Sequence, residues 1–368
     1  MEQGSKDSHV SRLLSRDMGR IRVAVAGLGK MGTYHVQALR RLAKGESEKY
    51  YKSGLDTQIR KLELCGLCDP DPEKSRRLAP DLPCFTDWQV LLAKASPDFV
   101  VIASPTETHF PMALQSLEAG VHTFVEKPLV TKLGEFKILN DAASSNGCRL
   151  ISGHVERYNP VAIKLRTMLS EKLIDVAGYR FQRSQPRDAR IPDDIVTDKI
   201  VHDLDLAQYF FGAIIYYHMV NSKRADGRIQ EATVFLRHTS GVEGTLFVSW
   251  LIQDARKCRE IRISCRDGSC MLGDFADKKL TMDGKALSCD VPSWVKPDNN
   301  QIKDELADFV SYCILPDPDM PVFQPLLQTW EIKDSIAIIE DLVRWTQSPG
   351  DTDCRQEQEA DDDKICKR

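Results

Sequence analysis

The sequence predicts an α/β protein, in which a doubly wound parallel sheet is followed by an α+β domain with a large, open and mostly antiparallel sheet. In the first half, short apolar runs alternate with amphipathic segments, which is the pattern of βαβ units. After about residue 152, short alternating strands follow one another and are separated by turn pairs such as Asp226-Gly227 and Asp283-Gly284. At 368 residues, the chain is long enough for two domains.

A glycine-rich turn lies between the first predicted strand, Ile21–Ala26, and the first predicted helix, Met31–Leu42. In this position Gly27 permits a sharp turn, and Gly29 lets backbone amides approach a pyrophosphate. Gly32 lets the helix pack closely on the strand, and the helix N-terminus presents its unpaired N–H groups to an anion. We therefore expect a dinucleotide here. The alternative is a glycine-rich turn that binds nothing.

Asp69 follows the second predicted strand, Leu62–Cys68. An acidic side chain at this point accepts hydrogen bonds from an adenosine ribose and repels a 2′-phosphate, so it favours NAD over NADP. It lies further from the glycines than the usual spacing of about 20 residues, which we attribute to a surface insertion over residues 44–61. The alternative is that Asp69 is an ordinary turn residue, because it begins an Asp-Pro-Asp-Pro sequence.

Further βαβ units complete the first domain. The expected helices are Trp88–Lys94, Pro111–Ala119 and Leu133–Asn146, and the expected strands are Phe99–Ala103, Thr123–Val125 and Arg149–Ser152. Ligands of such sheets bind beyond the carboxyl ends of the strands, and that rim includes Ser104–His109 and Glu126–Pro128. Lys127 is the first candidate for chemistry there. The alternative, an exposed loop lysine, is less favoured because Pro128 restricts the backbone directly after it.

The second domain is predicted to contain strands over 176–183, 216–221, 230–237, 242–250, 260–265, 269–272 and 279–282. After a first helix over Val161–Leu173, helices over Leu204–Phe211, Gln301–Cys313 and Leu326–Trp345 are expected to cover one face of this sheet. The other face must be covered by the ligand crevice or by another subunit. We therefore expect a homodimer or homotetramer.

Asp198 and His202 precede the predicted helix Leu204–Phe211 and are spaced to share one helical face. A carboxylate bonded to one imidazole nitrogen sets the tautomer and raises the basicity of the other nitrogen. Such a pair suits a general base that removes an alcohol proton near neutral pH. The alternative is a solvated histidine at the start of a helix, with the aspartate as its N-cap.

Composition excludes several classes of protein. The net charge of −4 argues against a nucleic-acid partner, because phosphate binding favours a basic excess. No apolar run approaches the roughly 18 residues that a membrane span needs. The polar segment over residues 1–19 lacks the apolar core of a secretory signal. We therefore expect a cytoplasmic protein without nucleic-acid or membrane partners.

Eleven scattered cysteines, an odd number in a long chain, predict reduced thiols rather than a disulfide framework. Cys65-x-x-Cys68 raises the alternative of zinc or redox chemistry. However, the motif lies in a predicted strand, where side chains three residues apart point to opposite faces. No second such pair completes a four-ligand site. We expect core thiols and no metal.

Four motifs occur in order between about Ile21 and Trp345. They are Gly27-x-Gly29-x-x-Gly32-x-x-His35, Ser104-Pro105-Thr106-x-x-His109, Glu126-Lys127-Pro128 and Asp198-x-x-x-His202-Asp203-x-Asp205. In this combination the chain resembles the glucose-fructose oxidoreductase/inositol dehydrogenase/rhizopine catabolism (Gfo/Idh/MocA) family. The resemblance implies an NAD-dependent sugar dehydrogenase in which Lys127, Asp198 and His202 form the catalytic set. It also implies that the cofactor is bound by Gly27, Gly29, Lys30, Met31, Gly32, Asp69, Ser104, Pro105, Thr106, His109, Glu126 and Lys127.

The resemblance extends to domain organisation. We expect a flexible extension over residues 1–19 and an NAD-binding Rossmann domain over residues 20–152. A substrate-binding and oligomerisation domain is expected over residues 153–348. The charged, apolar-poor segment over residues 349–368 is predicted to be disordered.

Within the family, the segment Gly153–Pro160, with Pro186-Arg187 and Arg190-Ile191, resembles the UDP-N-acetylglucosamine 3-dehydrogenase subgroup. This implies oxidation at C3 of that nucleotide sugar or a related one. The implied substrate-binding residues are Lys127, His154, Arg157, Tyr158, Asn159, Arg190 and His202. Asp194 and Lys199 depart from the subgroup, which has a glycine and an apolar residue at these positions.

The arginines of this region also bear on the substrate. Guanidinium groups suit a diphosphate, and Arg157, Arg183, Arg187 and Arg190 fall in segments expected near the crevice. The alternative is that these are ordinary surface arginines. Two other functions remain open: a dehydrogenase of inositol or free monosaccharides with the same catalytic residues, and a non-catalytic NAD-binding regulator.

Overall fold

The computed structural model describes residues 20–44, 62–188, 193–252, 257–289, 300–314 and 329–345. These residues form two compact units. The first comprises the described parts of Met1–Asn159 and Val291–Ile336, and the second comprises those of Pro160–Asp290 and Ala337–Arg368. The predicted extension over 1–19, the insertion beyond Lys44 and the charged tail over 349–368 lie outside the described residues.

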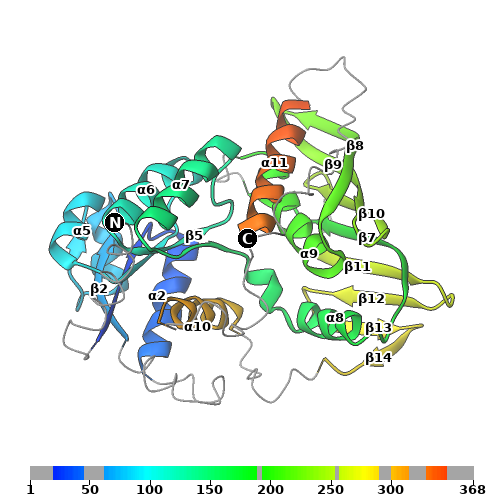
Figure 1. The fold of residues 1–368 in the computed structure, drawn as a ribbon, viewed down its shortest axis with the longest axis horizontal. Coiled ribbons are helices and arrows are strands. Elements are labelled where there is room, and N and C mark those ends of the chain that lie inside the picture. Colours follow the sequence, from blue (N-terminus) through cyan, green and yellow to red (C-terminus); the bar gives the residue numbers. More distant parts are fainter. Residues whose placement is uncertain are drawn as a thin grey trace, which may run out of the picture. The chain divides into compact units, whose positions relative to one another are not determined.

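The first unit is built on a six-stranded parallel sheet with the order β3-β2-β1-β4-β5-β6 (Figure 1). The strands are β1 (Ile21–Ala26), β2 (Leu62–Cys68), β3 (Cys84–Phe85), β4 (Phe99–Ile102), β5 (His122–Glu126) and β6 (Leu150–Gly153). The order reverses direction between β1 and β4, so their carboxyl ends form the topological switch point at which such sheets bind ligands. The prediction of a doubly wound sheet is confirmed.

Helices cover both faces of this sheet. They are α2 (Lys30–Ala43), α4 (Pro72–Leu78), α5 (Trp88–Ala95), α6 (His109–Glu118), α7 (Leu133–Ser145) and α10 (Gln301–Ile314). Side chains alternate along β1, so that Val23 and Val25 pack with residues of α2 and α10 while Ala24 and Ala26 pack with residues of α5, α6 and α7. Because both faces of the sheet are buried, the sequences of its strands are nearly continuous runs of apolar residues.

Helix α10 departs from the sequence-based expectation. We expected this segment to cover the second sheet, but it packs beside α2 on the first. The Phe309 ring contacts Phe99 edge-on, with a centroid distance of 5.7 Å, and lies 5.6 Å from the Phe124 ring. The expectation is wrong because helical periodicity identifies an apolar face but not the sheet that this face meets.

The Cys65-x-x-Cys68 pair also differs from expectation. Val23 pairs with Leu64 and Ala24 pairs with Gly66, so Cys65 is an extra residue that bulges β2. As a result, both cysteines contribute to the same apolar cluster, and the prediction that they point to opposite faces is wrong. Burial raises the pKa of each thiol to about 11. No group of three or more metal-ligating side chains occurs within the described ranges.

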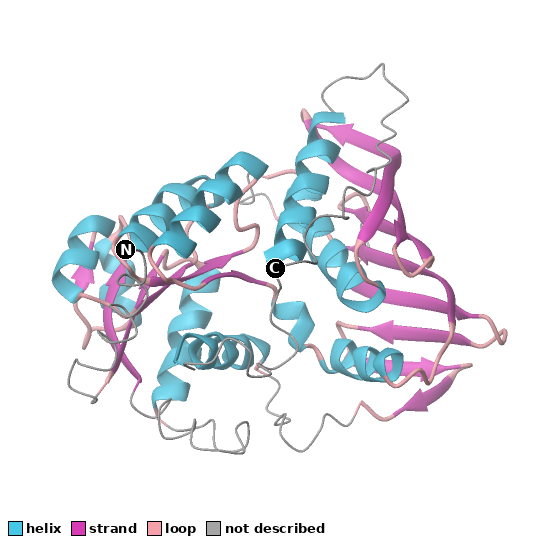
Figure 2. Cartoon of the chain, viewed as in Figure 1, coloured by secondary structure: helices cyan, strands magenta, loops and turns pink. Residues whose placement is uncertain are grey.

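The second unit contains an eight-stranded sheet with the order β14-β13-β12-β11-β7-β10-β9-β8, whose strands are labelled in Figure 1 and drawn in magenta in Figure 2. Among the described strand pairs of this second sheet, only β7 and β10 are parallel, which confirms the mostly antiparallel prediction. Asp226 and Asp283 adopt φ angles of 52° and 48°, and each precedes a glycine with positive φ, as tight hairpin turns require. The strands are β7 (Val176–Ser184), β8 (Ile214–Ala225), β9 (Arg228–His238), β10 (Glu243–Ser249), β11 (Cys258–Cys265), β12 (Cys270–Asp274), β13 (Lys279–Met282) and β14 (Lys285–Leu287).

Helices α8 (Pro160–Ser170) and α9 (Val201–Phe211) cover one face of the second sheet, together with the second half of α11 (Thr329–Trp345). Ile332 and Ile336 of α11 belong to the core of the first unit, whereas Ile339 and Leu342 belong to that of the second. Helix α11, 17 residues long, is amphipathic.

In the described part of the chain, no helix combines the length and apolar character needed to cross a membrane.

Replacing Phe309 with alanine should destabilise the first unit by about 3–5 kcal/mol, because it removes a fully buried ring from between β4, β5 and α10. Chemical denaturation followed by circular dichroism measures the change. Ile138→Ala is the matched control, since this side chain on α7 is 49% exposed. Equal effects of the two substitutions would contradict the assignment of α10 to the first core.

Candidate active site

The glycine turn after β1 closes tightly against the chain that follows β4. Gly27 has a φ of +80°, and a Cβ atom there would lie 2.4 Å from the Cα of Ser104. A Cβ on Gly32 would lie only 1.7 Å from the carbonyl oxygen of Gly27. Gly29, in contrast, has no atom within 4 Å of the position that its Cβ would take. The turn is therefore packed on two sides and open above Gly29.

The open side of the turn is the N-terminus of α2. Gly29 is the N-cap residue, no side chain caps the helix, and its first turn contains no acidic residue. Gly29 and Lys30 are exposed, and Met31 is half-buried. Backbone N–H groups and the positive end of the helix dipole therefore remain available for an anion. This arrangement fits the pyrophosphate of a dinucleotide.

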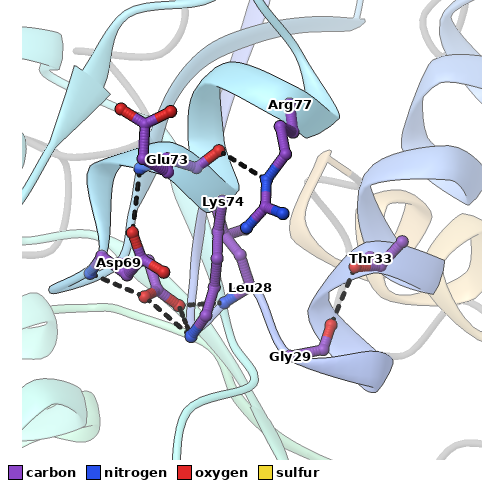
Figure 3. A network of polar contacts seen from close by, with 8 residues as sticks. Leu28, Gly29, Thr33, Asp69, Glu73, Lys74 and Arg77 are labelled. Atoms are coloured by element: carbon purple, nitrogen blue, oxygen red, sulfur yellow. Dashed lines mark hydrogen bonds and ion pairs between the residues drawn. The ribbon is translucent and has the colours of Figure 1, made fainter.

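Asp69 lies beside this turn (Figure 3). Its Oδ2 accepts a hydrogen bond from the Leu28 amide at 2.8 Å, and its Oδ1 accepts one from the Asp71 amide at 3.0 Å. Lys74 Nζ lies 3.0 Å from Oδ1 and 3.3 Å from Oδ2. Burial raises the pKa of Asp69, but these three donors outweigh burial and hold the pKa below its ordinary value. The carboxylate is therefore ionised near neutral pH.

Both sequence-based interpretations of Asp69 describe part of this geometry. The bond to the Asp71 amide is an Asx turn, as expected of a turn aspartate. The bond to Leu28 also ties the end of β2 to the glycine turn, where a ribose-binding acid belongs. Sequence reasoning missed Lys74. Asp71 and Pro72 are a recognisable helix start, and this start would have placed Lys74 in the first turn of α4, close to Asp69.

The loop after β4 is braced by a buried histidine. His109 is 1% exposed, and its Nδ1 and Nε2 lie 2.8 Å from the Pro128 carbonyl and 2.9 Å from the Ser104 carbonyl. Both ring nitrogens thus lie within hydrogen-bonding distance of backbone carbonyl oxygens, and contact of His109 with the cofactor stays a prediction. Pro105 is exposed and Thr106 half-buried at the rim, so these two remain candidates for contact with a ligand.

Glu126 is likewise engaged within the protein. Its carboxylate lies 2.6 Å from His35 Nε2 and accepts the Lys127 backbone N–H at 3.2 Å. A carboxylate only accepts, so His35 carries a proton on Nε2. Burial raises the pKa of Glu126, but the hydrogen bond from His35 and the charge of Lys127 outweigh burial and hold the pKa below its ordinary value. Glu126 therefore holds the backbone of Lys127, and sequence reasoning missed His35 as its partner although His35 stands in the glycine motif.

Lys127 follows the carboxyl end of β5 and is half-buried. Only β4 separates β5 from β1 in the sheet, so Lys127 lies about 10 Å from the glycine turn at the usual strand spacing. The structure thus brings Lys127, the glycine turn and Asp69 to the same edge of the first sheet.

Two of the arginines expected near the substrate, Arg157 and Arg183, form buried ion pairs. Arg157 is 1% exposed, and its NH2 and NH1 groups lie 2.9 and 3.3 Å from the carboxylate of Glu331. In the second unit, Arg183 forms a bidentate pair with Asp203, with a shortest distance of 2.7 Å. Both guanidinium groups are thus engaged within the fold, where removing either carboxylate would leave a buried charge uncompensated. The contact of Arg157 and Arg183 with a diphosphate stays a prediction.

The other expected substrate residues of the first unit flank Arg157 on η2 (Val155–Tyr158). His154, Tyr158 and Asn159 are all buried, and the His154 backbone amide donates to Glu305 on α10. Arg190 lies outside the described residues. In this structure the segment is buried and contacts α10, and its assignment to substrate binding stays a prediction.

In the second unit, Asp198 lies in a single π-helical turn, Val196–Ile200, and His202 lies in the first turn of α9. Asp194 Oδ1 accepts hydrogen bonds from the Val196 and Thr197 amides at 2.9 and 3.1 Å. The side chain of Asp194 therefore satisfies backbone amides at the start of this segment. Asp198 is 8% exposed and pairs with Lys199 Nζ at 3.0 Å, so both departures from the subgroup have structural roles here.

Comparison with known families agrees with this geometry. Residues 21–154 match the family model described as an oxidoreductase family with an NAD-binding Rossmann fold, and residues 174–271 match the GFO/IDH/MocA C-terminal domain. Both units of the chain are thus covered by models of one family.

Individual relatives are more distant. The chain is 27% identical over 266 residues to a UDP-N-acetylglucosamine 3-dehydrogenase of Acidithiobacillus ferrooxidans, covering 72% of this chain and 77% of that protein. It is 25% identical over 289 residues to the scyllo-inositol 2-dehydrogenase (NAD(+)) of Bacillus subtilis, covering 74% and 80%. Its fold is similar to that of an inositol dehydrogenase homologue of Azotobacter vinelandii in complex with NADH and myo-inositol. The TM-score is 0.74 at 16% identity, covering 89% and 96% of the two chains.

Glu126→Gln should lower the free energy of unfolding by about 1–3 kcal/mol at neutral pH, because the buried His35 then loses an ionised acceptor. The pKa of Glu126 is depressed in the folded state, so its stabilising contribution is complete above the ordinary glutamate value of about 4.3. The contribution disappears as the pH falls through the folded pKa.

Urea unfolding at a series of pH values tests this pattern. The difference between the wild type and Glu126→Gln should shrink on acidification, whereas Glu107→Gln, at an exposed position on η1 (Thr106–Thr108), should have little effect at any pH. A difference that stays constant with pH would rule out an ionised Glu126.

Proposed function

Since the chain belongs to the Gfo/Idh/MocA family of NAD-binding oxidoreductases, we propose that it oxidises C3 of UDP-N-acetylglucosamine or a related nucleotide sugar. The general activity, NAD-dependent oxidation of a sugar or cyclitol hydroxyl, follows from the family, whose relatives are named dehydrogenases of sugars and cyclitols. The observation that carries the proposal is the shared edge of the first sheet, where the glycine turn, Asp69 and Lys127 lie at the ends of β1, β2 and β5.

The chain's own residues would divide the chemistry as follows. His202 accepts the proton of the substrate hydroxyl, and Asp198 orients its ring. Lys127 would donate a hydrogen bond to a substrate hydroxyl oxygen and stabilise the alkoxide charge that develops on it. Bound NAD would supply the hydride acceptor. Glu126 supports Lys127 by fixing its backbone amide, so the ammonium group is presented from a rigid strand end.

The arginines give limited support for a diphosphate. Arg157 and Arg183 are internal, which leaves Arg187 and Arg190 of the four candidates. Arg187 is half-buried, with its guanidinium 5.5 Å from the centre of the Trp250 ring. This shortage favours a second candidate function, the oxidation of inositol or a free monosaccharide, because an uncharged cyclitol needs only groups that bind hydroxyls.

A substrate panel distinguishes the two candidates. The purified protein is incubated with NAD and either UDP-N-acetylglucosamine, UDP-N-acetylgalactosamine, myo-inositol, scyllo-inositol or glucose, and the absorbance of the reduced nicotinamide is followed. The primary proposal expects turnover of a UDP-linked sugar at a higher kcat/KM than of any cyclitol. Turnover of a cyclitol alone would replace it with the second candidate.

Lys127→Met should lower kcat by at least about 100-fold, because it removes a charged donor to the developing alkoxide. The dissociation constant of NADH, measured by nicotinamide fluorescence, should change little. Lys132→Met is the matched control, since Lys132 is exposed and pairs with Glu135, three residues further along. Unchanged turnover of Lys127→Met would exclude a catalytic role for this lysine.

We also propose a homodimer or homotetramer. The face of the second sheet opposite α8 and α9 carries half-exposed aromatic side chains, among them Tyr216, Phe235 and Phe247. Light scattering coupled to size-exclusion chromatography measures the mass, and a monomer at micromolar concentration would refute this proposal.

A further inference from the structure

Lys74 is bound to Asp69, the side chain that we expect to recognise the adenosine ribose (Figure 3). Its ammonium group lies 3.0 Å from Oδ1 and 3.3 Å from Oδ2 of Asp69. The lysine side chain is 42% exposed, whereas that of Asp69 is 5% exposed. The carboxylate is therefore fixed within the protein, while the lysine approaches it from solvent.

The acceptor capacity of Asp69 is used up in this arrangement. A carboxylate offers about four lone-pair positions. Leu28 takes one on Oδ2, Asp71 takes one on Oδ1, and Lys74 takes one on each oxygen. Ribose hydroxyls can donate to Asp69 only by displacing Lys74, because the two amide donors are held by the glycine turn and by the start of α4.

The positive charge of Lys74 also weakens the preference for NAD over NADP. A lone aspartate repels the 2′-phosphate of NADP, and this repulsion is the usual basis for preferring NAD. Here the ammonium group neutralises the carboxylate at close range. A displaced Lys74 remains tethered one helical turn from Asp71, the N-cap of α4, and so stays beside the ribose position. A lysine is a suitable partner for a phosphate group.

We propose that Lys74 determines cofactor choice: it competes with the ribose hydroxyls of NAD for Asp69 and binds the 2′-phosphate of NADP, so that the protein accepts both cofactors. This inference rests on dinucleotide binding at the glycine turn and not on the identity of the sugar. It assigns Lys74 a role in specificity that differs from a purely structural one. A lysine that merely held Asp69 in place would support both cofactors equally.

Direct binding tests the proposal without any sugar substrate. The dissociation constants of NADH and NADPH are measured by nicotinamide fluorescence and checked by calorimetry for the wild type and Lys74→Met. NADPH should bind more weakly to the variant, because a partner of its 2′-phosphate is lost. NADH should bind as tightly or more tightly, because two acceptor positions of Asp69 are released. The NADPH/NADH ratio of dissociation constants should rise by about tenfold, equivalent to about 1.4 kcal/mol.

Two further variants keep the result interpretable. Lys74→Arg retains the positive charge and should keep the ratio within about threefold of the wild type. Arg77→Met removes a positive charge from the same helix, where its Nε donates to the Glu73 carbonyl and not to Asp69. It should also leave the ratio within about threefold. Thermal melting of each variant verifies that it is folded.

Specific outcomes would overturn the inference. They are a ratio that rises by less than about threefold in Lys74→Met, an equal loss of both cofactors, or an effect of Arg77→Met as large as that of Lys74→Met. A wild type that binds NADH but not NADPH at millimolar concentration would also overturn it. Failure of the sugar panel would leave this test intact, because cofactor binding is measured alone.

Discussion

The buried contact between His35 and Glu126 ties together the parts of the first unit that must act as one. His35 lies on α2, directly after the glycine turn, and Glu126 ends β5. The same carboxylate accepts a hydrogen bond from the amide of Lys127, so α2 and the strand end that carries the lysine share one hydrogen-bonded group. His109 adds a second link, from the loop after β4 to Pro128. The sheet edge is thereby preorganised on both sides of Lys127.

The polar side chains near the expected sites fall into two groups with different uses. Arg157 and Arg183 each meet a carboxylate with little or no exposure to solvent, so their charge stabilises the fold. Asp69 is as buried as those carboxylates, but its partner Lys74 is 42% exposed and can exchange partners. Burial of the basic partner, more than its residue type, separates a structural ion pair from one that a ligand can replace.

Local sequence patterns predicted most elements of both sheets and the place of the glycine turn. Steric demands at Gly27 and Gly32 arise from neighbouring atoms of the turn and from Ser104, and a strand–glycine–helix pattern is enough to recognise them. Short elements were missed. Strand β3 is only two residues long and β14 only three, so neither shows a periodicity, whereas α4 had readable signals in its Asp71 cap and in Pro72. The bulge at Cys65 was not predictable, because it exists only in the pairing with β1.

The sequence by itself determined the fold class, the dinucleotide turn, the acid at the end of β2 and the lysine at the end of β5. These features depend on residues close together in the chain, whose backbone geometry and periodicity are local properties. Only the tertiary structure decided which charges neutralise one another and which sheet receives each helix. Arg157 and Glu331 are 174 residues apart, and α10 joins the first sheet from a distant part of the sequence. Such pairings follow from strand order and burial. Sequence patterns therefore predicted Arg157 to be a ligand-binding group, whereas the structure shows it buried in an ion pair.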